Sequence, residues 1–313
     1  MPAAFEVDPT LAGRLLAVAG VRGPVDSVRR LEGGISGSVF AVRGGGREVV
    51  LKLYREGMRV RMRREVLVYE LLGRRAPELP VPHLLGADSS ATLLPQSFVV
   101  LTKLEGTPLR TLALTERELI EANRKLGATL RALHRVRVDA FGEIADVADT
   151  YETNREFMLS RLEASLHEFE RLGGDLRLRR RLGREIDERA GLFDKCEHAV
   201  VCHNDGHDAN VLFAASPAGW LLSGLLDFEH ALAGDPLLDL ACTHEFSERK
   251  SDKTLAALID GYGLAGDWRA TFDLYLVHHR LGLWNLLAGL GVTGRLQPLA
   301  AQLEGTLGPA NVE

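Results

Sequence analysis

A short polar segment between two apolar runs is the feature that most constrains the fold. Residues 200–202 are Val-Val-Cys, residues 211–213 are Val-Leu-Phe, and His-Asn-Asp-Gly-His-Asp-Ala-Asn lies between them. Apolar, β-branched runs of this length are typical of buried strands. We therefore expect the polar side chains to project from a loop at the end of a sheet. Asp227 follows a second apolar run 17 residues after Asn210, which predicts another polar loop.

The chain divides into a strand-rich part and a helical part. In the first hundred residues, β-branched runs predict strands at 25–31, 38–43, 48–54, 83–87 and 98–103, with a helix at 59–72. After Gly106-Thr-Pro108 the spacing of apolar residues predicts helices at 115–134, 151–172, 175–193, 236–246, 253–262 and 268–290. Thr115 and Glu118 form a candidate capping box. We expect one short β segment among these helices, at 199–202, 211–213 and 221–226.

Composition excludes several classes of protein. The 313 residues are 46% hydrophobic and 26% charged, and 43 acids against 38 bases give a net charge of −5, which disfavours a nucleic-acid partner. Three cysteines without a CxxC pair indicate a reducing cytosol. The longest uncharged apolar run, 281–291, is far shorter than the roughly 20 residues of a membrane-spanning helix. Acids before the apolar run at 10–20 argue against a signal peptide. We expect a soluble, cytoplasmic protein without a membrane partner.

The two polar loops carry the residue types of a magnesium site. Asp205, Asn210 and Asp227 offer two carboxylates and one carboxamide. Oxygen ligands of this kind suit Mg²⁺, and a spare carboxylate suits the orientation of an attacking hydroxyl. Two other interpretations remain open. His203, Asp205, His207 and Asp208 could form the metal cluster of a hydrolase, or the chain could be an inactive binding module.

Lys52 is a charged residue in a strand that is otherwise apolar, Val49-Val-Leu-Lys-Leu-Tyr54. A buried charge is costly unless it has a partner, and Glu65 on the next helix could supply one. The alternative is that the ammonium group of Lys52 extends to water at the strand's edge. The sequence leaves both arrangements open.

Three motifs together carry a family resemblance. His203-x-Asp205-x4-Asn210, the following Asp227-Phe-Glu, and Gly234-Asp-Pro-Leu-Leu-Asp-Leu-Ala resemble the aminoglycoside phosphotransferase family of the protein-kinase-like superfamily. The resemblance covers nearly the whole chain. It implies an α+β, bilobal, protein-kinase-like fold: a nucleotide-binding lobe at 1–104 with a five-stranded antiparallel sheet plus a helix, and a larger, mainly helical lobe at 105–313 with the catalytic loop and the acceptor site.

The resemblance also implies a role for each candidate residue. Asp205 would be the catalytic base and His203 a support for its loop, while Asn210 and Asp227 would hold Mg²⁺. Lys52, paired with Glu65, would bind the phosphates of ATP, with GTP as an alternative nucleotide. The phosphate loop would contribute Gly34, Ser36 and Ser38, and the adenine would face the backbone of Thr102 and Leu104. Asn204, where the family usually has glycine, and Gly206-His207-Asp208 depart from the family pattern.

The acceptor is the least determined part of the function. Residues 139–170 contain nine acids and two bases, and residues 230–274 contain eight acids and four bases. An acidic cleft would attract a polycation, which favours an aminoglycoside-type antibiotic or an amino sugar as the hydroxyl acceptor. By the resemblance, choline-like alcohols, fructosamines, homoserine, macrolides and other sugars remain alternatives. The chain could act as a monomer or a homodimer.

Overall fold

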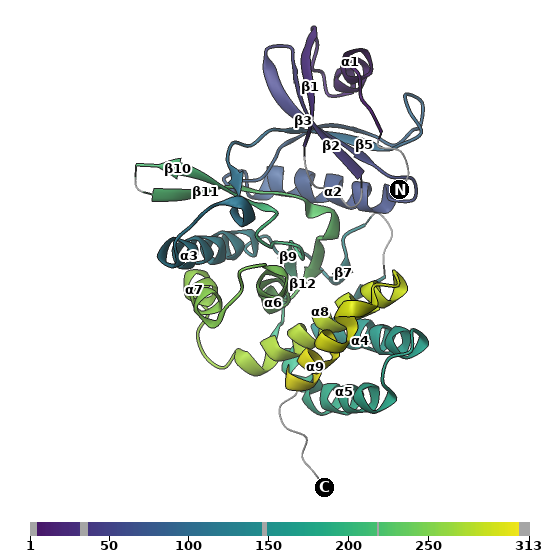
Figure 1. Cartoon of the computed structure of the whole chain (residues 1–313), viewed down its shortest axis with the longest axis vertical. Helices are drawn as coiled ribbons and strands as arrows, with labels where there is room; N and C mark the ends of the chain where they lie inside the picture. Colours follow the sequence, from purple (N-terminus) through teal and green to yellow (C-terminus); the bar gives the residue numbers. More distant parts are fainter. Residues whose placement is uncertain (1–4, 32–36, 146–148, 218, 307–313) are drawn as a thin grey trace. The chain divides into compact units, whose positions relative to one another are not determined.

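Figure 1 shows the computed structural model, which describes residues 5–31, 37–145, 149–217 and 219–306. The described chain forms two compact units. The first unit contains the residues up to Leu112, a short piece at Ile144 and the segment Asn210–Ala231. The second unit contains Ala113–Glu143, the segment that ends at Ala209, and the chain from Leu232 onward. A division into lobes at residue 104 stays a prediction.

The first unit is built on a five-stranded antiparallel sheet, as the sequence predicts. Its strand order is β1-β2-β3-β5-β4, with β1 at Val25–Leu31, β2 at Gly37–Gly44, β3 at Arg47–Tyr54, β4 at Leu84–Asp88 and β5 at Phe98–Thr102. Helices α1 (Pro9–Val18) and α2 (Arg59–Arg75) lie on different sides of this sheet (Figure 1). The predicted sheet and its helix are therefore confirmed.

Alternation along β3 separates the core from the candidate site. Leu51 and Leu53 are buried in a cluster with Leu15 and Leu16 of α1. Successive side chains of a strand point to opposite faces, so Lys52 points away from this cluster. A hydrogen bond from Tyr54 to Glu65 shows that this second face meets α2.

The apolar runs near residues 200–226 belong to two sheets rather than to one β segment. In the first unit, β10 (Val211–Ser216) and β11 (Gly219–Leu225) form a hairpin, and β10 also pairs with β6 (Thr107–Pro108). In the second unit, β9 (Val200–Cys202) pairs with β12 (Leu232–Gly234). The expectation of a single segment is wrong because these strands find their partners at 107–108 and 232–234, which strand propensity does not reveal.

The second unit is mainly helical. Its helices are α3 (Glu116–Leu133), α4 (Asn154–Arg171), α5 (Leu176–Arg189), α6 (Pro236–Phe246), α7 (Asp252–Tyr262), α8 (Arg269–Gly289) and α9 (Leu296–Thr306). Strands β7 (Phe141–Glu143) and β8 (Thr150–Tyr151) extend the small sheet in the order β8-β7-β12-β9. The predicted capping box begins α3, where the Glu118 N–H donates to Thr115 Oγ1 at 3.3 Å. Helix α9 has no counterpart among the predictions.

Short 3₁₀ turns complete the backbone, at η1 (Leu109–Thr111), η2 (Ala190–Lys195), η3 (Phe228–His230) and η4 (Thr293–Arg295). In the described chain, no helix combines the length and the apolar character that a bilayer crossing requires. Cys196, Cys202 and Cys242 are free thiols, as their odd number and spacing predict.

Candidate functional site

Lys52 lies in the first unit at the centre of a cluster of three carboxylates. Its Nζ is 2.8 Å from Glu65 Oε2, 2.7 Å from Asp227 Oδ1 and 2.9 Å from Glu229 Oε2. The side chain is 7% exposed, so the alternative in which the ammonium reaches water does not apply. Glu65 on α2 is the partner that the sequence suggested. Sequence reasoning left Glu229 without a role; it stands two residues after Asp227, in a 3₁₀ turn that brings its carboxylate to Lys52.

The charges in this cluster do not balance, which shifts their protonation. Burial raises the pKa of Glu65 to about 7; Lys52 opposes the shift, and the carboxylates of Asp227 and Glu229 reinforce it. Burial alone would lower the pKa of Lys52, but the three carboxylates outweigh it and raise this pKa well above its usual value. Lys52 therefore stays a cation, and the excess negative charge is shared among the acids.

Two arginines of α2 bind the segment that carries Glu229. Arg61 Nη1 donates to Glu229 Oε1 at 3.1 Å, and Arg64 Nη1 donates to the Glu229 carbonyl at 3.1 Å. Arg61 Nη1 also lies 3.2 Å from His230 Nε2. Helix α2 and turn η3 are thus held together by two side chains that precede Glu65, Arg64 by one residue and Arg61 by about one turn of helix.

Ligand atoms of Glu65, Asp227 and Glu229 all lie within 4.8 Å of one another, but Lys52 Nζ contacts an oxygen of each, so its ammonium group occupies the centre of the cluster. Hard carboxylate oxygens are the ligands that Mg²⁺ prefers, and the partly exposed Asp227 is the carboxylate through which this cluster would hold the ion. Asp227 has a left-handed backbone, with φ 69°, and its side chain is 30% exposed. The Leu226 N–H donates to the Asn210 carbonyl at 2.9 Å. Asn210 therefore lies beside the residue that precedes Asp227.

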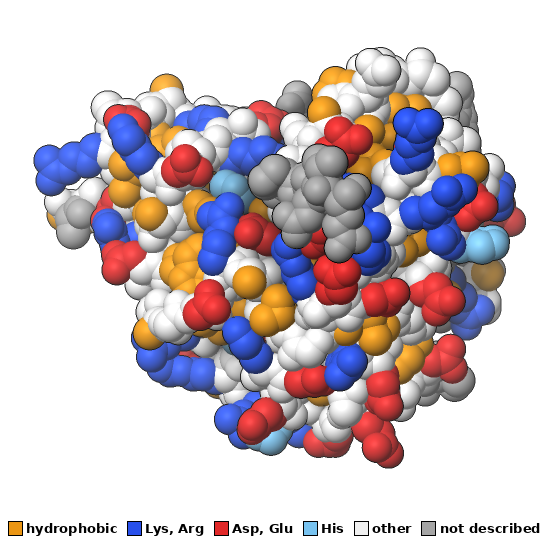
Figure 2. Space-filling model, turned by 90° about the horizontal axis from the view of Figure 1, so that it is seen from below, with side chains coloured by type: hydrophobic (Ala, Val, Ile, Leu, Met, Phe, Trp, Pro, Cys, Tyr) orange, Lys and Arg blue, Asp and Glu red, His pale blue; other side chains and the backbone are white. Residues whose placement is uncertain are grey.

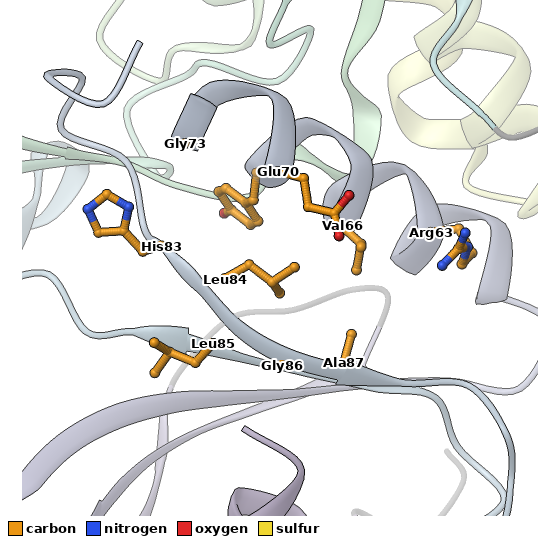
Figure 3. A pocket seen from close by; sticks show the side chains of 10 residues that line it. Arg63, Val66, Glu70, Gly73, His83, Leu84, Leu85, Gly86 and Ala87 are labelled. Carbon is orange, nitrogen blue, oxygen red and sulfur yellow. The ribbon is translucent and has the colours of Figure 1, made fainter. Parts of the chain in front are cut away.

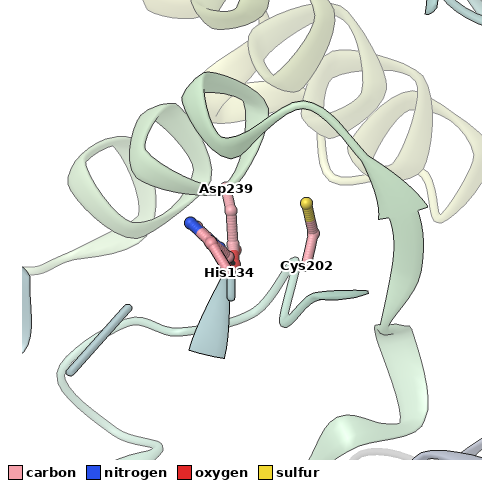
Figure 4. Close-up of side chains that lie close together, drawn as sticks. All are labelled: His134, Cys202 and Asp239. Atoms are coloured by element: carbon pink, nitrogen blue, oxygen red, sulfur yellow. Dashed lines mark hydrogen bonds and ion pairs between the residues drawn. The ribbon is translucent and has the colours of Figure 1, made fainter. Parts of the chain in front are cut away.

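Asp239 fixes the loop of Asp205 in the second unit. Its Oδ2 accepts the His203 N–H at 2.7 Å, and its Oδ1 accepts the Asn204 N–H at 2.7 Å. His134 Nε2 lies 3.0 Å from Oδ2, and Figure 4 shows the side chains of His134 and Asp239 side by side. Burial alone would raise the pKa of Asp239, but the hydrogen bonds and the neighbouring His134 hold this pKa below its usual value. Asp239 is thus an ionised anchor for two backbone amides.

The backbone explains the asparagine at position 204. Asn204 has φ 57°, in the left-handed region. Glycine adopts this region without strain, and asparagine is among the residues that tolerate it best. The departure from the family's usual glycine therefore leaves the turn intact.

His203 and Asp205 are joined within the same loop. His203 is fully buried, and its Nδ1 accepts the Asp205 N–H at 3.2 Å. The Asp205 side chain is 27% exposed and lies 3.4 Å from His207 Nε2. The ring of His203 therefore contacts the loop backbone, which suits a supporting residue.

The hydrolase interpretation lacks a metal-binding arrangement. In the described parts of the chain, two groups of side chains bring three possible ligand atoms together: Glu65, Asp227 and Glu229, and His134, Cys202 and Asp239. The set of His203, Asp205, His207 and Asp208 is not among them. In the second group, Asp239 already binds two amides and His134, and Cys202 Sγ donates to the Asp235 carbonyl at 3.4 Å. Hydrogen bonds therefore account for the group of His134, Cys202 and Asp239.

The remaining candidates lie in the first unit. Ser38 on β2 accepts a hydrogen bond from Arg30 at 3.4 Å. Thr102 ends β5, where its Oγ1 accepts the His83 N–H at 2.8 Å, and Leu104 follows that strand. Gly34 and Ser36 lie outside the described residues. The nucleotide contacts assigned to these five positions stay predictions.

A cavity of about 520 Å³ opens between α2 and β4 (Figure 3). Val66 and Leu84 line it, with Arg63 and His83 among its polar residues. None of the predicted site residues lines this cavity. It therefore does not mark the candidate site, although Val66 is the neighbour of Glu65.

Comparison with known proteins gives one family. The model of the phosphotransferase enzyme family matches residues 27–272. A segment of 103 residues is 29% identical to an N-acetylmuramate/N-acetylglucosamine kinase of Caulobacter vibrioides. This match covers 33% of the chain and 28% of the kinase.

Solved structures share the fold at low identity. A Thermobifida fusca protein assigned as a fructosamine-3-kinase is 21% identical with a TM-score of 0.71, over 96% of this chain and 99% of that one. A thermostable mutant of the aminoglycoside phosphotransferase APH(4)-Ia, in complex with ADP and hygromycin B, is 16% identical with a TM-score of 0.70, over 96% and 98% of the two chains. At these identities the likeness concerns the fold.

Proposed function

The chain belongs to the phosphotransferase enzyme family, and we propose that it is a small-molecule kinase that transfers the γ-phosphate of ATP to a hydroxyl of an amino sugar or an aminoglycoside-type acceptor. The observation that carries the proposal is the buried cluster of Lys52 with Glu65, Asp227 and Glu229. The ammonium group of Lys52 suits the binding of phosphate, and the partly exposed carboxylate of Asp227 suits the binding of Mg²⁺.

In this proposal Lys52 binds the phosphates, and Asn210 and Asp227 hold Mg²⁺. The bound Mg²⁺ supplies neutralisation of the phosphate charge. Asp205 accepts the proton of the acceptor hydroxyl while the oxygen of that hydroxyl forms a bond to the γ-phosphorus. The bond from this phosphorus to the bridging oxygen breaks, and ADP leaves with the electron pair. Positioning and charge neutralisation provide most of the acceleration, because the transition state is loose.

The paired charges of α4 favour an amino sugar over a polycation. Of the acids between 139 and 170, Glu143 lies 2.6 Å from Arg161, a base that the count already includes, and Glu168 lies 2.6 Å from Arg171, just beyond the counted range. Glu170 lies 3.1 Å from Arg179 of α5, which the count of charges within 139–170 leaves out. Figure 2 shows acidic and basic side chains interspersed over one face. The acidic excess is thus smaller than the sequence count suggests, and the matched segment belongs to an amino-sugar kinase.

A coupled ADP-release assay tests the function. N-acetylglucosamine, N-acetylmuramate, hygromycin B, a fructosamine and choline are offered with MgATP or MgGTP. We expect release that depends on an amino sugar or aminoglycoside and on ATP. If no acceptor raises ADP release above the rate of hydrolysis, the proposed function is wrong.

The Asp205→Asn variant tests the base in the same assay. We expect kcat to fall roughly 10²–10⁴-fold with nucleotide affinity unchanged, because the amide cannot accept the hydroxyl proton. Asp187→Asn on the exposed side of α5 is the matched control. A near-normal kcat in Asp205→Asn contradicts the assignment.

A further inference from the structure

The ring of His207 lies between two carboxylates of its own loop. Its Nε2 is 3.4 Å from Asp205 Oδ1, and its Nδ1 is 3.7 Å from Asp208 Oδ1. The His207 N–H also donates to the Asp205 carbonyl at 2.9 Å. Backbone and side chain of His207 therefore both face Asp205, the residue proposed as the base.

The hydrogen bonds define which ring nitrogen donates. The Ala209 N–H donates to His207 Nδ1 at 3.2 Å, so in this geometry Nδ1 has a free lone pair and the proton of a neutral ring is on Nε2. Burial lowers the pKa of His207, but hydrogen bonds to Asp205 and Asp208 outweigh it and raise this pKa to about 9. A second proton on the ring would bind to Nδ1. The hydrogen bond from the Ala209 N–H would then be lost, and Nδ1–H would face Asp208 instead. Both forms keep Nε2–H, which faces Asp205.

The far side of the His207 ring is anchored. Asp208 is 3% exposed, and its Oδ2 accepts the Glu248 N–H at 3.1 Å. Its Oδ1 accepts no hydrogen bond within the residues that the structure describes. A buried carboxylate oxygen favours a nearby donor, so Asp208 Oδ1 stabilises the His207 ring when Nδ1 carries a proton. Through Oδ2, Asp208 also ties the loop to the turn after α6.

We propose that His207 is a positioning residue that holds Asp205 Oδ1 through its Nε2–H and thereby orients the Asp205 carboxylate toward the proton of the acceptor hydroxyl. This inference rests on the proposed function, in which Asp205 is the base. It gives His207 and Asp208 a joint role: Asp208 holds the ring, and the ring orients the base. A base held in one rotamer is already oriented when the acceptor binds.

Two variants of similar polarity distinguish this role from packing. In His207→Gln the side-chain amide nitrogen can occupy the place of Nε2, whereas in His207→Asn the shorter amide reaches only the place of Nδ1. With MgATP and N-acetylglucosamine, or hygromycin B if it supports more turnover, we expect His207→Gln to keep kcat within about threefold and His207→Asn to lower it roughly 10–100-fold. The KM for ATP should stay the same in both.

The exposed His198 provides the control, because Gln and Asn there should leave kcat unchanged. Thermal unfolding of each variant shows whether the loop stays folded. Equal losses of kcat in His207→Gln and His207→Asn, or equal retention, overturn the positioning role.

A second measurement does not depend on turnover. In long-range ¹H–¹⁵N spectra of the full chain, the His207 signals are assigned by their loss in His207→Gln. We expect an Nε2–H signal that shifts in Asp205→Ala, while the signals of His198 do not. An unshifted His207 signal overturns the proposal even in an active enzyme. If the signal shifts but no acceptor releases ADP, the contact between Asp205 and His207 stands, and the proposed function falls together with the contact's role in catalysis.

Discussion

Lys52 is surrounded by more negative charge than it neutralises. This imbalance predicts how the substitution of Lys52 changes the free energy of unfolding. Lys52→Met leaves Glu65 and Glu229 buried without their shared cation. Removal of one partner from a buried ion pair costs about 3–5 kcal/mol. We expect a loss of this size in the free energy of unfolding, measured by urea denaturation.

The double variant Lys52→Met/Glu65→Gln should recover part of that stability, because it removes one of the unpaired charges. Lys253→Met is the matched control, since the exposed pair of Lys253 and Glu116 contributes little. If Lys52→Met unfolds at the same urea concentration as the wild type, the buried carboxylates are not stabilised by the charge of Lys52. An inactive Lys52 variant therefore needs this stability measurement beside it.

Asp227 provides a second test at the same cluster. Asp227→Asn keeps a residue that tolerates the left-handed backbone at φ 69°, so the charge is removed with little strain. We expect the Mg²⁺ concentration for half-maximal nucleotide binding to rise about tenfold or more, which corresponds to about 1.4 kcal/mol or more. A fluorescent ATP analogue titrated with Mg²⁺ measures it. An unchanged Mg²⁺ titration would count against Asp227 as a ligand.

Residue types predicted the contact of Lys52 with Glu65, and the structure adds partners that they could not predict. Lys52 stood out because a charge in an apolar strand needs a partner, and the cluster contains Glu65. Glu229 and Arg61 were not assigned because an acid after a strand and an arginine on a helix are ordinary surface residues in sequence. Their pairing joins positions 168 residues apart, which no local pattern encodes.

At the scale of elements, α3 and α7 contact each other through glycines. A Cβ on Gly127 would lie 2.1 Å from the Leu258 carbonyl oxygen, and a Cβ on Gly261 would lie 1.9 Å from the Arg124 carbonyl oxygen. The two helices therefore approach backbone to backbone. Glycine lowers the stability of a helix interior relative to alanine. At these two positions the close contact between the helices accounts for its presence.

Substitution by alanine should have opposite effects in α3 and α8. Gly127→Ala forces α3 from α7, and we expect it to destabilise the protein by about 1–3 kcal/mol, the usual cost of overpacking. Gly282 in the exposed part of α8 has open space around a Cβ, so Gly282→Ala should stabilise it by up to about 1 kcal/mol. Urea denaturation of both variants measures the difference. A stabilising Gly127→Ala would contradict the close helix contact.

Helices and long strands were predictable because their signals are local. The capping box of α3 and the alternation in β3 lie within a few residues of each other, and the predicted elements match the observed ones closely. Strands β6 and β12 have two or three residues each, too few for a pattern, and form only because distant strands offer them hydrogen bonds. Their positions could not be read from sequence.

At the scale of the whole molecule, buried histidines should make stability depend on pH. Burial lowers the pKa of His244 and of His279 to about 4, and lowers that of His278 well below its usual value. His279 Nε2 lies 2.9 Å from the Leu238 carbonyl, and burial together with the charge of Arg161 opposes protonation of the ring. The folded chain thus holds these rings neutral.

The sign follows from proton binding. Between pH 6.5 and about 4 the unfolded chain binds more protons at these histidines than the folded chain, so stability falls as pH falls through this window. His244 and His279 each contribute on the order of 1–3 kcal/mol over this window. We expect the change in the free energy of unfolding between pH 7 and pH 5 to be less destabilising in His279→Gln than in the control His198→Gln, because the variant lacks the ring that resists protonation. Equal slopes for the two variants would refute the assignment.

The contacts of Arg61 and Arg64 with Glu229 bear on the position of Glu65 in the proposed site. They join α2 to the turn that carries Glu229, through the side chain and the backbone carbonyl of that residue. In the proposed kinase, the place of Glu65 beside Lys52 would therefore depend on two arginines that precede it in its own helix.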